Sequence, residues 1–221
     1  MPNRLLRYKS LPYQAKRTVV RAVPFLRNNE YNLTLSHSHK FLWFRVSKVG
    51  TRTLLHEFNK IGVDVDGTHQ RLINYTEGSY PDYYKFAFVR NPWDRLVSAW
   101  TNKVVHRNAF RLEYRLHVEL QSFDKFVRYI SKLDISRSDI HIRPQIHAID
   151  LQNINFVGRY ESYEENVRYV FDALKLPLAE LSKYNISKDK KLAYREYYTD
   201  CLAEKVSVLY RADIEQFNYE F

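Results

Sequence analysis

Three short runs of apolar residues alternate with segments of helical periodicity. The runs extend from Phe41 to Val46, from Phe86 to Val89 and from Ile154 to Val157, and each is apolar at odd and even positions alike. Such runs predict strands that are buried on both faces of a sheet. Because a helical pattern follows each run, the sequence predicts an α/β fold, with a parallel β-sheet flanked by helices.

The three helices have recognisable ends. The first is predicted from Leu54 to Ile61 and stops at Gly62, and the second begins near Asp94. The third follows residues 162–165, Ser-Tyr-Glu-Glu, which have the pattern of a capping box. Each helix should therefore cross over the sheet between two neighbouring strands.

The pattern also suggests how the chain is divided. Residues 1–40 scatter basic residues among short apolar ones and lack the continuous apolar stretch of a secretory signal, so we expect a basic arm or a surface helix there. Residues 41–221 are expected to form one domain. Apolar runs in this sequence are far shorter than the roughly 18 to 20 residues of a membrane helix, so no integral membrane segment is expected.

Charge and cysteine content indicate the kind of partner and the cellular compartment. The formal net charge is +10, which favours anionic partners such as an acidic glycan, a phosphorylated nucleotide or nucleic acid. One cysteine, Cys201, leaves no internal disulfide and suits a reducing compartment. We therefore expect a cytoplasmic location.

An arginine stands at or near the carboxyl end of each predicted strand. These are Arg45, Arg90 and Arg159. Ligands of open α/β sheets bind at this edge. The sequence thus predicts a site for a ligand with several negative charges. Arg159 itself is expected to have a structural role near the strand ends, with contact to the acceptor as the alternative.

The turn after the first strand reads Ser-Lys-Val-Gly-Thr-Arg-Thr over residues 47–53. Backbone N–H groups at a helix N-terminus favour an anion, Gly50 permits a close approach, and Thr51 and Thr53 add hydroxyl donors. A Walker A motif is absent, so an ordinary strand-to-helix turn is the alternative.

The second motif extends from Phe86 to Trp100. Pro92 marks a helix start, which places Arg90 at the end of the strand and Ser98 on the first turns of the helix. A guanidinium and a hydroxyl can then converge on a second anion. The alternative is a salt bridge for Arg90 and a packing role for Ser98.

In this order, the two motifs resemble the 5′-phosphosulfate-binding loop and the 3′-phosphate-binding strand and helix of sulfotransferases. Residues 89–92, Val-Arg-Asn-Pro, and 95–99, Arg-Leu-Val-Ser-Ala, are similar to the carbohydrate sulfotransferases in particular. Residues 141–145, 156–161 and 210–219 extend the resemblance, which covers about residues 41–221. Ser47 and Ile142 depart from the proline and tryptophan that are usual there.

The resemblance implies a P-loop-nucleotide-kinase-like sulfotransferase fold. It also implies 3′-phosphoadenosine 5′-phosphosulfate as the sulfuryl donor, with a hydroxyl acceptor, most readily on a glycan. No metal is expected, because protein cations can neutralise the donor's phosphates. The donor residues implied or expected, in chain order, are Arg45, Lys48, Gly50, Thr51, Arg52, Thr53, Arg90, Ser98 and, from the late basic run, Lys188.

Two catalytic roles follow. Lys48 is placed to stabilise the charge that develops on the oxygen bridging to the departing 5′-phosphate. A general base would activate the acceptor hydroxyl. His69 is the first choice, since it precedes Arg90 by 21 residues, similar to the spacing in related enzymes. The alternatives are His141, a carboxylate such as Glu57, or no protein base at all.

Other functions remain open at this point. A nucleotide kinase shares a parallel sheet and a phosphate loop, but this chain lacks a Walker A motif and a clear magnesium carboxylate. A nucleic-acid-binding module would suit the charge, but no known nucleic-acid motif is present and no nucleic-acid partner is expected. His37 and His39 form an H-x-H pair without further ligands at zinc-site spacing.

Overall fold

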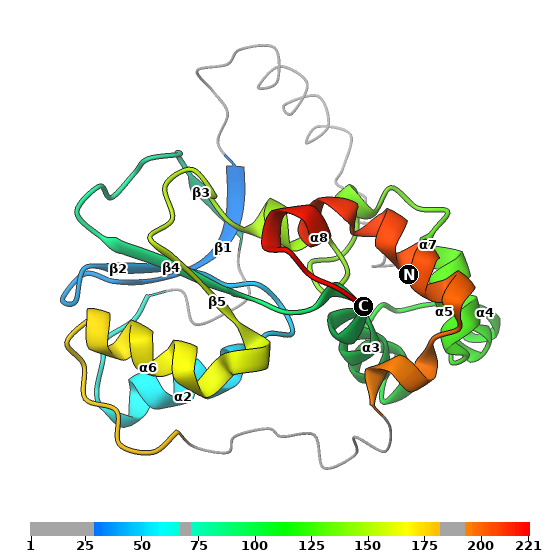
Figure 1. Cartoon of the computed structure of the whole chain (residues 1–221), viewed down its shortest axis with the longest axis horizontal. Helices are drawn as coiled ribbons and strands as arrows, with labels where there is room; N and C mark the ends of the chain where they lie inside the picture. Colours follow the sequence, from blue (N-terminus) through cyan, green and yellow to red (C-terminus); the bar gives the residue numbers. More distant parts are fainter. Residues whose placement is uncertain (1–28, 67–71, 182–192) are drawn as a thin grey trace.

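The computed structural model describes residues 29–66, 72–181 and 193–221, and its core is a five-stranded mixed sheet in the order β3-β1-β2-β4-β5 (Figure 1). The strands are β1 (Asn29–Ser36), β2 (Phe41–Phe44), β3 (Leu72–Tyr75), β4 (Tyr84–Val89) and β5 (Phe156–Arg159). Strands β2, β4 and β5 are parallel neighbours, as the three apolar runs predict. The α/β class is therefore confirmed.

The sheet is not purely parallel. Strand β1 is antiparallel to both β2 and β3, with Leu33 opposite Phe44 and Tyr31 opposite Ile73. The sheet thus begins before residue 41, within the stretch for which the sequence predicted an arm or helix. A basic arm over residues 1–28 lies outside the described residues and stays a prediction.

Two helices cover one face of the sheet. These are α2 (Thr51–Lys60) and α6 (Tyr163–Ala173), which lie beneath the strands in Figure 1. Phe58 of α2 stacks on Phe171 of α6 at 5.2 Å and on Phe41 of β2 at 5.0 Å between ring centroids. This aromatic layer fixes α2, and with it the turn that precedes α2, against the parallel strands.

The expected capping box at Ser162 is wrong. Ser162 occupies the N-cap position of α6, but its side chain makes no capping hydrogen bond. A 3₁₀ turn, η5 (Tyr160–Ser162), connects β5 to α6 and gives Ser162 a backbone conformation that differs from the extended one usual at an N-cap.

A second group of helices lies beside the sheet (Figure 1). Its members are α3 (Pro92–Trp100), α4 (Tyr114–Glu119), α5 (Phe123–Ile130), α7 (Asp200–Leu209) and α8 (Arg211–Phe217). Helix α3 continues into a π-helical turn, η2 (Thr101–Val105), in which the N–H of His106 donates to Thr101 O at 2.9 Å. The other 3₁₀ turns are η3 (Ile135–Arg137), η4 (Gln145–Ala148) and η6 (Tyr194–Tyr197).

Candidate active site

The turn between β2 and α2 is closed on itself. The backbone is left-handed at Lys48 (φ 75°) and at Gly50 (φ 82°), and the Thr51 hydroxyl donates to Val46 O at 3.1 Å. The N–H of Thr53 donates to Gly50 O at 3.0 Å as α2 begins. The turn therefore brings Lys48 to the N-terminal end of α2, where helix N–H groups favour an anion.

Gly50 is required by its surroundings as well as by its φ angle. The Tyr163 hydroxyl donates to Gly50 O at 2.8 Å, and a Cβ atom on Gly50 would lie 2.7 Å from the Tyr163 ring. Gly62 is the natural comparison, because its φ of 72° is also left-handed but no atom lies within 4 Å of a Cβ there. The two glycines share the conformational requirement and differ in the steric one.

We expect Gly50→Ala to destabilise the protein more than Gly62→Ala. Both substitutions place a side chain at positive φ, which costs about 1–3 kcal/mol, but only the first also displaces the Tyr163 ring. Thermal unfolding of both variants measures the difference, and nucleotide affinity should fall for Gly50→Ala alone. Equal losses of stability would show that Tyr163 does not constrain the turn.

Lys48 lies in a strongly positive environment. Burial is the largest cause that lowers its pKa to about 7, and the charge of Arg90 lowers it further. Lys103, Arg52 and Arg107 add to this effect. Gathering cations around a partly buried ammonium group is unfavourable unless an anion binds among them. The cluster therefore fits a ligand with several negative charges.

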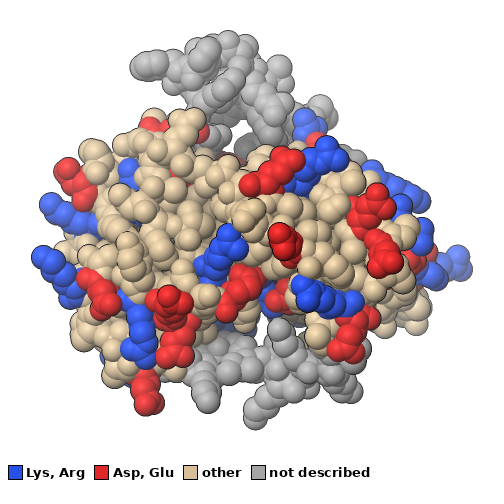
Figure 2. Space-filling model, viewed as in Figure 1, with Lys and Arg blue, Asp and Glu red and all other residues tan. Residues whose placement is uncertain are grey.

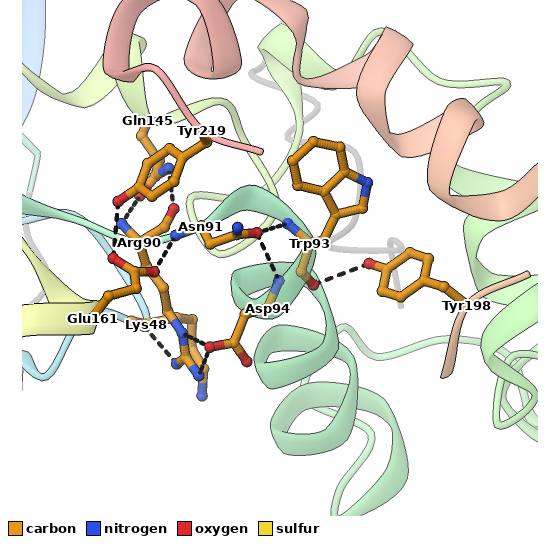
Figure 3. A network of polar contacts seen from close by, with 9 residues as sticks. All are labelled: Lys48, Arg90, Asn91, Trp93, Asp94, Gln145, Glu161, Tyr198 and Tyr219. Atoms are coloured by element: carbon orange, nitrogen blue, oxygen red, sulfur yellow. Dashed lines mark hydrogen bonds and ion pairs between the residues drawn. The ribbon is translucent and has the colours of Figure 1, made fainter. Parts of the chain in front are cut away.

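Arg90 links this turn to helix α3. Its Nε and Nη2 atoms contact Asp94 Oδ2 at 2.9 and 2.7 Å, and its Nη1 donates to Lys48 O at 3.1 Å (Figure 3). The guanidinium lies 4.2 Å from the centroid of the Tyr160 ring. Further N–H groups remain on Nη1 and Nη2 for a bound anion. Ser98, four residues beyond Asp94, lies on the same side of α3.

A buried network holds the backbone of Arg90 and Asn91. The Arg90 N–H donates to Gln145 Oε1 at 3.0 Å, and Gln145 Nε2 donates back to Arg90 O at 2.8 Å. Glu161 accepts from the Asn91 N–H at 2.6 Å and from the Tyr219 hydroxyl at 3.1 Å (Figure 3). The end of β4 is thereby fixed from the η4 turn, from the η5 turn after β5 and from the C-terminal residues.

Helix α3 starts at a defined cap. The Asn91 side chain accepts from the N–H groups of Trp93 and Asp94 and donates to Glu220 O at 2.8 Å. Trp93 is held in turn, since Tyr198 donates to its carbonyl at 3.0 Å (Figure 3). The helix that carries Asp94 and Ser98 therefore begins at a fixed position, directly after Arg90.

Arg95 is a structural residue that the sequence did not single out. It is 2% exposed, its Nε donates to Ser47 O at 3.0 Å, and its Nη2 donates to Ile140 O at 3.2 Å. One buried guanidinium thus ties the turn before Lys48 to the segment before His141. Sequence could not reveal this pairing, because the partners lie 48 and 45 residues away.

The three strand-end arginines do not share one site. Arg45 donates to Asn32 Oδ1 at 2.6 Å and lines a cavity that also includes Glu30 and His147, so we no longer place it at the donor. Arg159 lies against the Tyr219 ring and donates to Phe217 O. The three side chains therefore do not converge, because Arg45 is bound to Asn32 of the neighbouring strand β1 and Arg159 packs against the C-terminal residues in a structural role.

Of the remaining predicted site residues, the structure describes four and leaves two undescribed. Thr51 and Thr53 belong to the first turn of α2 and are partly buried and buried, whereas Arg52 is exposed. Glu57 is 1% exposed and lies 3.8 Å from the ammonium group of Lys60. His69 and Lys188 lie outside the described residues, so their roles stay predictions.

Two further observations concern metals and membranes. Within residues 29–66, 72–181 and 193–221, no group of three or more His, Cys, Asp or Glu side chains could hold a metal ion. His37 contacts the Tyr83 hydroxyl at 2.6 Å instead. Among the helices of the described chain, none is both long and apolar enough to cross a membrane.

Comparisons with known proteins agree with this geometry. A profile of the sulfotransferase family matches residues 31–220, so the chain belongs to that family. Human carbohydrate sulfotransferase 14 is 25% identical over 194 residues, which are 76% of this chain and 50% of that protein. Its zebrafish (Danio rerio) counterpart is 24% identical over 182 residues, 66% of this chain and 49% of that protein.

A shorter match supports the same assignment. Human carbohydrate sulfotransferase 8 is 29% identical over 117 residues, which are 43% of this chain and 27% of that protein. The chain spans about half the length, or less, of these curated relatives. No solved structure matches it.

Proposed function

We propose that this chain transfers a sulfuryl group from 3′-phosphoadenosine 5′-phosphosulfate to a carbohydrate hydroxyl. The observation that carries the proposal is the hydrogen bond from Arg90 to Lys48 O at 3.1 Å, within a cluster of cations. This hydrogen bond joins the turn of residues 47–53 to Arg90, and each of these two places can bind an anion. The donor likewise carries phosphate at two separate positions, the 5′ and the 3′. The carbohydrate acceptor is proposed from the names of the relatives, which are carbohydrate sulfotransferases.

The donor would bind in two parts. The turn of residues 47–53 would hold the 5′-phosphosulfate as a P-loop-like phosphate cradle, with N–H groups of α2 and the Lys48 ammonium as donors. Arg90 and Ser98 would hold the 3′-phosphate. These cations supply the positive charge that a metal ion supplies in many phosphoryl-transfer enzymes.

Lys48 would promote the reaction through charge. As the bond from sulfur to the bridging oxygen breaks, negative charge grows on that oxygen, and an ammonium group aimed at it stabilises the transition state more than the ground state. Anion binding also raises the pKa of Lys48, because a nearby negative charge favours the protonated form. The site thus becomes charged when the donor is present.

The rival functions are less well supported. This sequence contains neither the Walker A motif of a nucleotide kinase nor a known nucleic-acid-binding motif. The family assignment favours neither function. On the face shown in Figure 2, basic and acidic residues are interspersed, with no continuous basic surface for a nucleic-acid backbone. A cytoplasmic location stays a prediction.

Ligand-induced stabilisation tests the donor proposal. 3′-Phosphoadenosine 5′-phosphate should raise the melting temperature, because a ligand that binds only the folded state stabilises it by mass action. ATP with Mg²⁺ serves as the control and should have little effect. Stabilisation by ATP with Mg²⁺ but not by the bisphosphorylated nucleotide would favour a kinase and overturn the proposal.

Nucleotide binding should depend on pH through Lys48. With a pKa of about 7 in the free protein, Lys48 is largely neutral near about pH 8, and a bound anion restores its proton. The affinity for the nucleotide should therefore fall as pH rises above about 7. It should stop falling once the pH exceeds the higher pKa that Lys48 has in the complex. The nucleotide phosphates, with a pKa of about 6, are already ionised there.

Calorimetry in two buffers of different ionisation enthalpy measures this proton uptake at about pH 8. We expect the wild type to take up more protons than Lys48→Met, by as much as one proton. Identical uptake by both proteins would show that Lys48 does not change its protonation state when the nucleotide binds.

A further inference from the structure

Asp139 and His141 form a hydrogen-bonded pair between η3 and η4. Asp139 Oδ1 lies 2.6 Å from His141 Nδ1 and accepts from the His141 backbone N–H at 2.9 Å. The histidine is 7% exposed. Because the carboxylate contacts both the ring and the backbone of the same residue, the orientation of the imidazole is fixed.

This pairing determines which ring nitrogen can act as a base. An ionised Asp139 requires a proton on His141 Nδ1, so the neutral imidazole carries its lone pair on Nε2. None of the described residues makes a hydrogen bond to Nε2. A neutral imidazole with an oriented lone pair is the usual form of a general base.

Arg95 places this pair next to the donor turn. Its Nε donates to the carbonyl of Ser47, which precedes Lys48, and its Nη2 donates to the carbonyl of Ile140, which precedes His141. The Tyr210 hydroxyl donates to Ile142 O at 2.6 Å from the other side. Lys48 and His141 are thus anchored through one buried guanidinium.

Burial and neighbouring positive charges favour the neutral form of His141 by lowering its pKa. Burial is the largest cause that lowers its pKa, and the charges of Lys103 and Lys48 lower it further. The hydrogen bond and charge of Asp139 act in the opposite direction. Lys103 belongs to the π-helical turn η2, an irregularity that is frequent at functional sites. Cations of the donor site therefore adjoin the imidazole.

We infer that His141 accepts the proton of the attacking acceptor hydroxyl, and that Asp139 is its positioning residue. The inference rests on the proposed sulfotransferase function, and it assigns to a described residue the role that the sequence predicted for His69. Lys48 then faces the leaving group, and His141 faces the incoming hydroxyl.

The proposed step is balanced in protons and electrons. The hydroxyl proton moves to His141 Nε2 while the hydroxyl oxygen forms a bond to sulfur. The bond from sulfur to the bridging oxygen breaks, and its electron pair stays on that oxygen, which leaves 3′-phosphoadenosine 5′-phosphate. Protonated His141 then returns its proton to solvent.

Variants that preserve the fold test the assignment. His141→Gln keeps an N–H for Asp139 but has no basic lone pair, and Asp139→Asn removes the charge that orients the ring. His147→Ala is the matched control, because His147 is a second histidine six residues further along, in the η4 turn, and lines a cavity with Arg45. Melting temperatures and affinity for 3′-phosphoadenosine 5′-phosphate verify that each variant is folded and binds nucleotide.

At saturating donor, with a panel of desulfated glycans as acceptors, we expect His141→Gln to lose about 10²-fold or more in turnover. Its pH profile should lose the acidic limb, while nucleotide affinity stays near that of the wild type. Asp139→Asn should lose less turnover, and His147→Ala should lose none. Normal turnover and an intact acidic limb in His141→Gln, with both lost in His69→Ala, would return the role to His69.

Nuclear magnetic resonance separates this inference from the proposed function. If the wild type transfers nothing to any glycan, the proposed function fails, and the imidazole can still be titrated. We expect a neutral His141 protonated at Nδ1, with a pKa that rises when 3′-phosphoadenosine 5′-phosphate neutralises Lys48 and Lys103. A neutral form protonated at Nε2, or a pKa that the nucleotide does not change, would overturn the assignment.

Discussion

Replacing Lys48 by methionine should lower turnover by about 10²- to 10³-fold with only a modest loss of affinity for the product nucleotide. The asymmetry follows from where charge develops. The ammonium group stabilises the bridging oxygen mainly as the bond to sulfur breaks, whereas the product's phosphates are also held by N–H groups of α2 and by Arg90. Single-turnover rates and calorimetry on the same preparation measure the two effects.

The surface residue Lys125 supplies a control for the loss of one positive charge. It is exposed on α5, so Lys125→Met should leave both turnover and nucleotide affinity unchanged. If Lys48→Met kept normal turnover, the leaving group would have to be stabilised by another residue. If it lost affinity and turnover equally, Lys48 would act in the ground state as much as in the transition state.

The opposite pattern is expected for Arg90. Arg90→Met removes a charged donor to the proposed 3′-phosphate. It also removes the ion pair in which Arg90 Nη2 lies 2.7 Å from Asp94 Oδ2. Charge-assisted hydrogen bonds contribute about 1.5–3 kcal/mol, so affinity for 3′-phosphoadenosine 5′-phosphate should fall by about 10- to 100-fold. Turnover at saturating donor should change less.

A second ligand isolates the phosphate that Arg90 recognises. Adenosine 5′-phosphate lacks the 3′-phosphate, so it should bind wild type and Arg90→Met with nearly the same affinity. The loss of the 3′-phosphate and the loss of Arg90 are then non-additive, as expected for direct partners. Additive effects on affinity would show that Arg90 acts on nucleotide binding through the fold alone.

The parallel half of the sheet could be predicted because strands β2 and β4 are largely buried and appear as apolar runs, and because an apolar run also overlaps the start of the edge strand β5. Each of the three strands is followed by a helix with a clear apolar stripe. Strand β1 was missed although Tyr31, Leu33 and Leu35 alternate along it, because it lies beside a strongly basic segment. Strand β3 reads Leu-Ile-Asn-Tyr with Ile73 and Asn74 exposed, so it shows neither a continuous apolar run nor an alternating pattern.

The site was predictable where chain order places residues together. Lys48 and Arg90 stand at the ends of adjacent parallel strands, so their proximity follows from the sheet topology. Position at a strand end does not determine side-chain direction, and for this reason the sequence could not show that Arg45 binds Asn32 of strand β1. Gln145 and Arg95 act through contacts between distant segments, which single-sequence patterns do not reveal.

The transfer reaction itself tests the central proposal most directly. The protein is incubated with 3′-phosphoadenosine 5′-phosphosulfate labelled in its sulfuryl group and with the glycan panel, and both products are quantified by mass spectrometry. We expect label to appear on a glycan in the same molar amount as 3′-phosphoadenosine 5′-phosphate is released, and we expect Lys48→Met to abolish nearly all of both. Nucleotide release without labelled glycan, or no turnover of the donor at all, would contradict it.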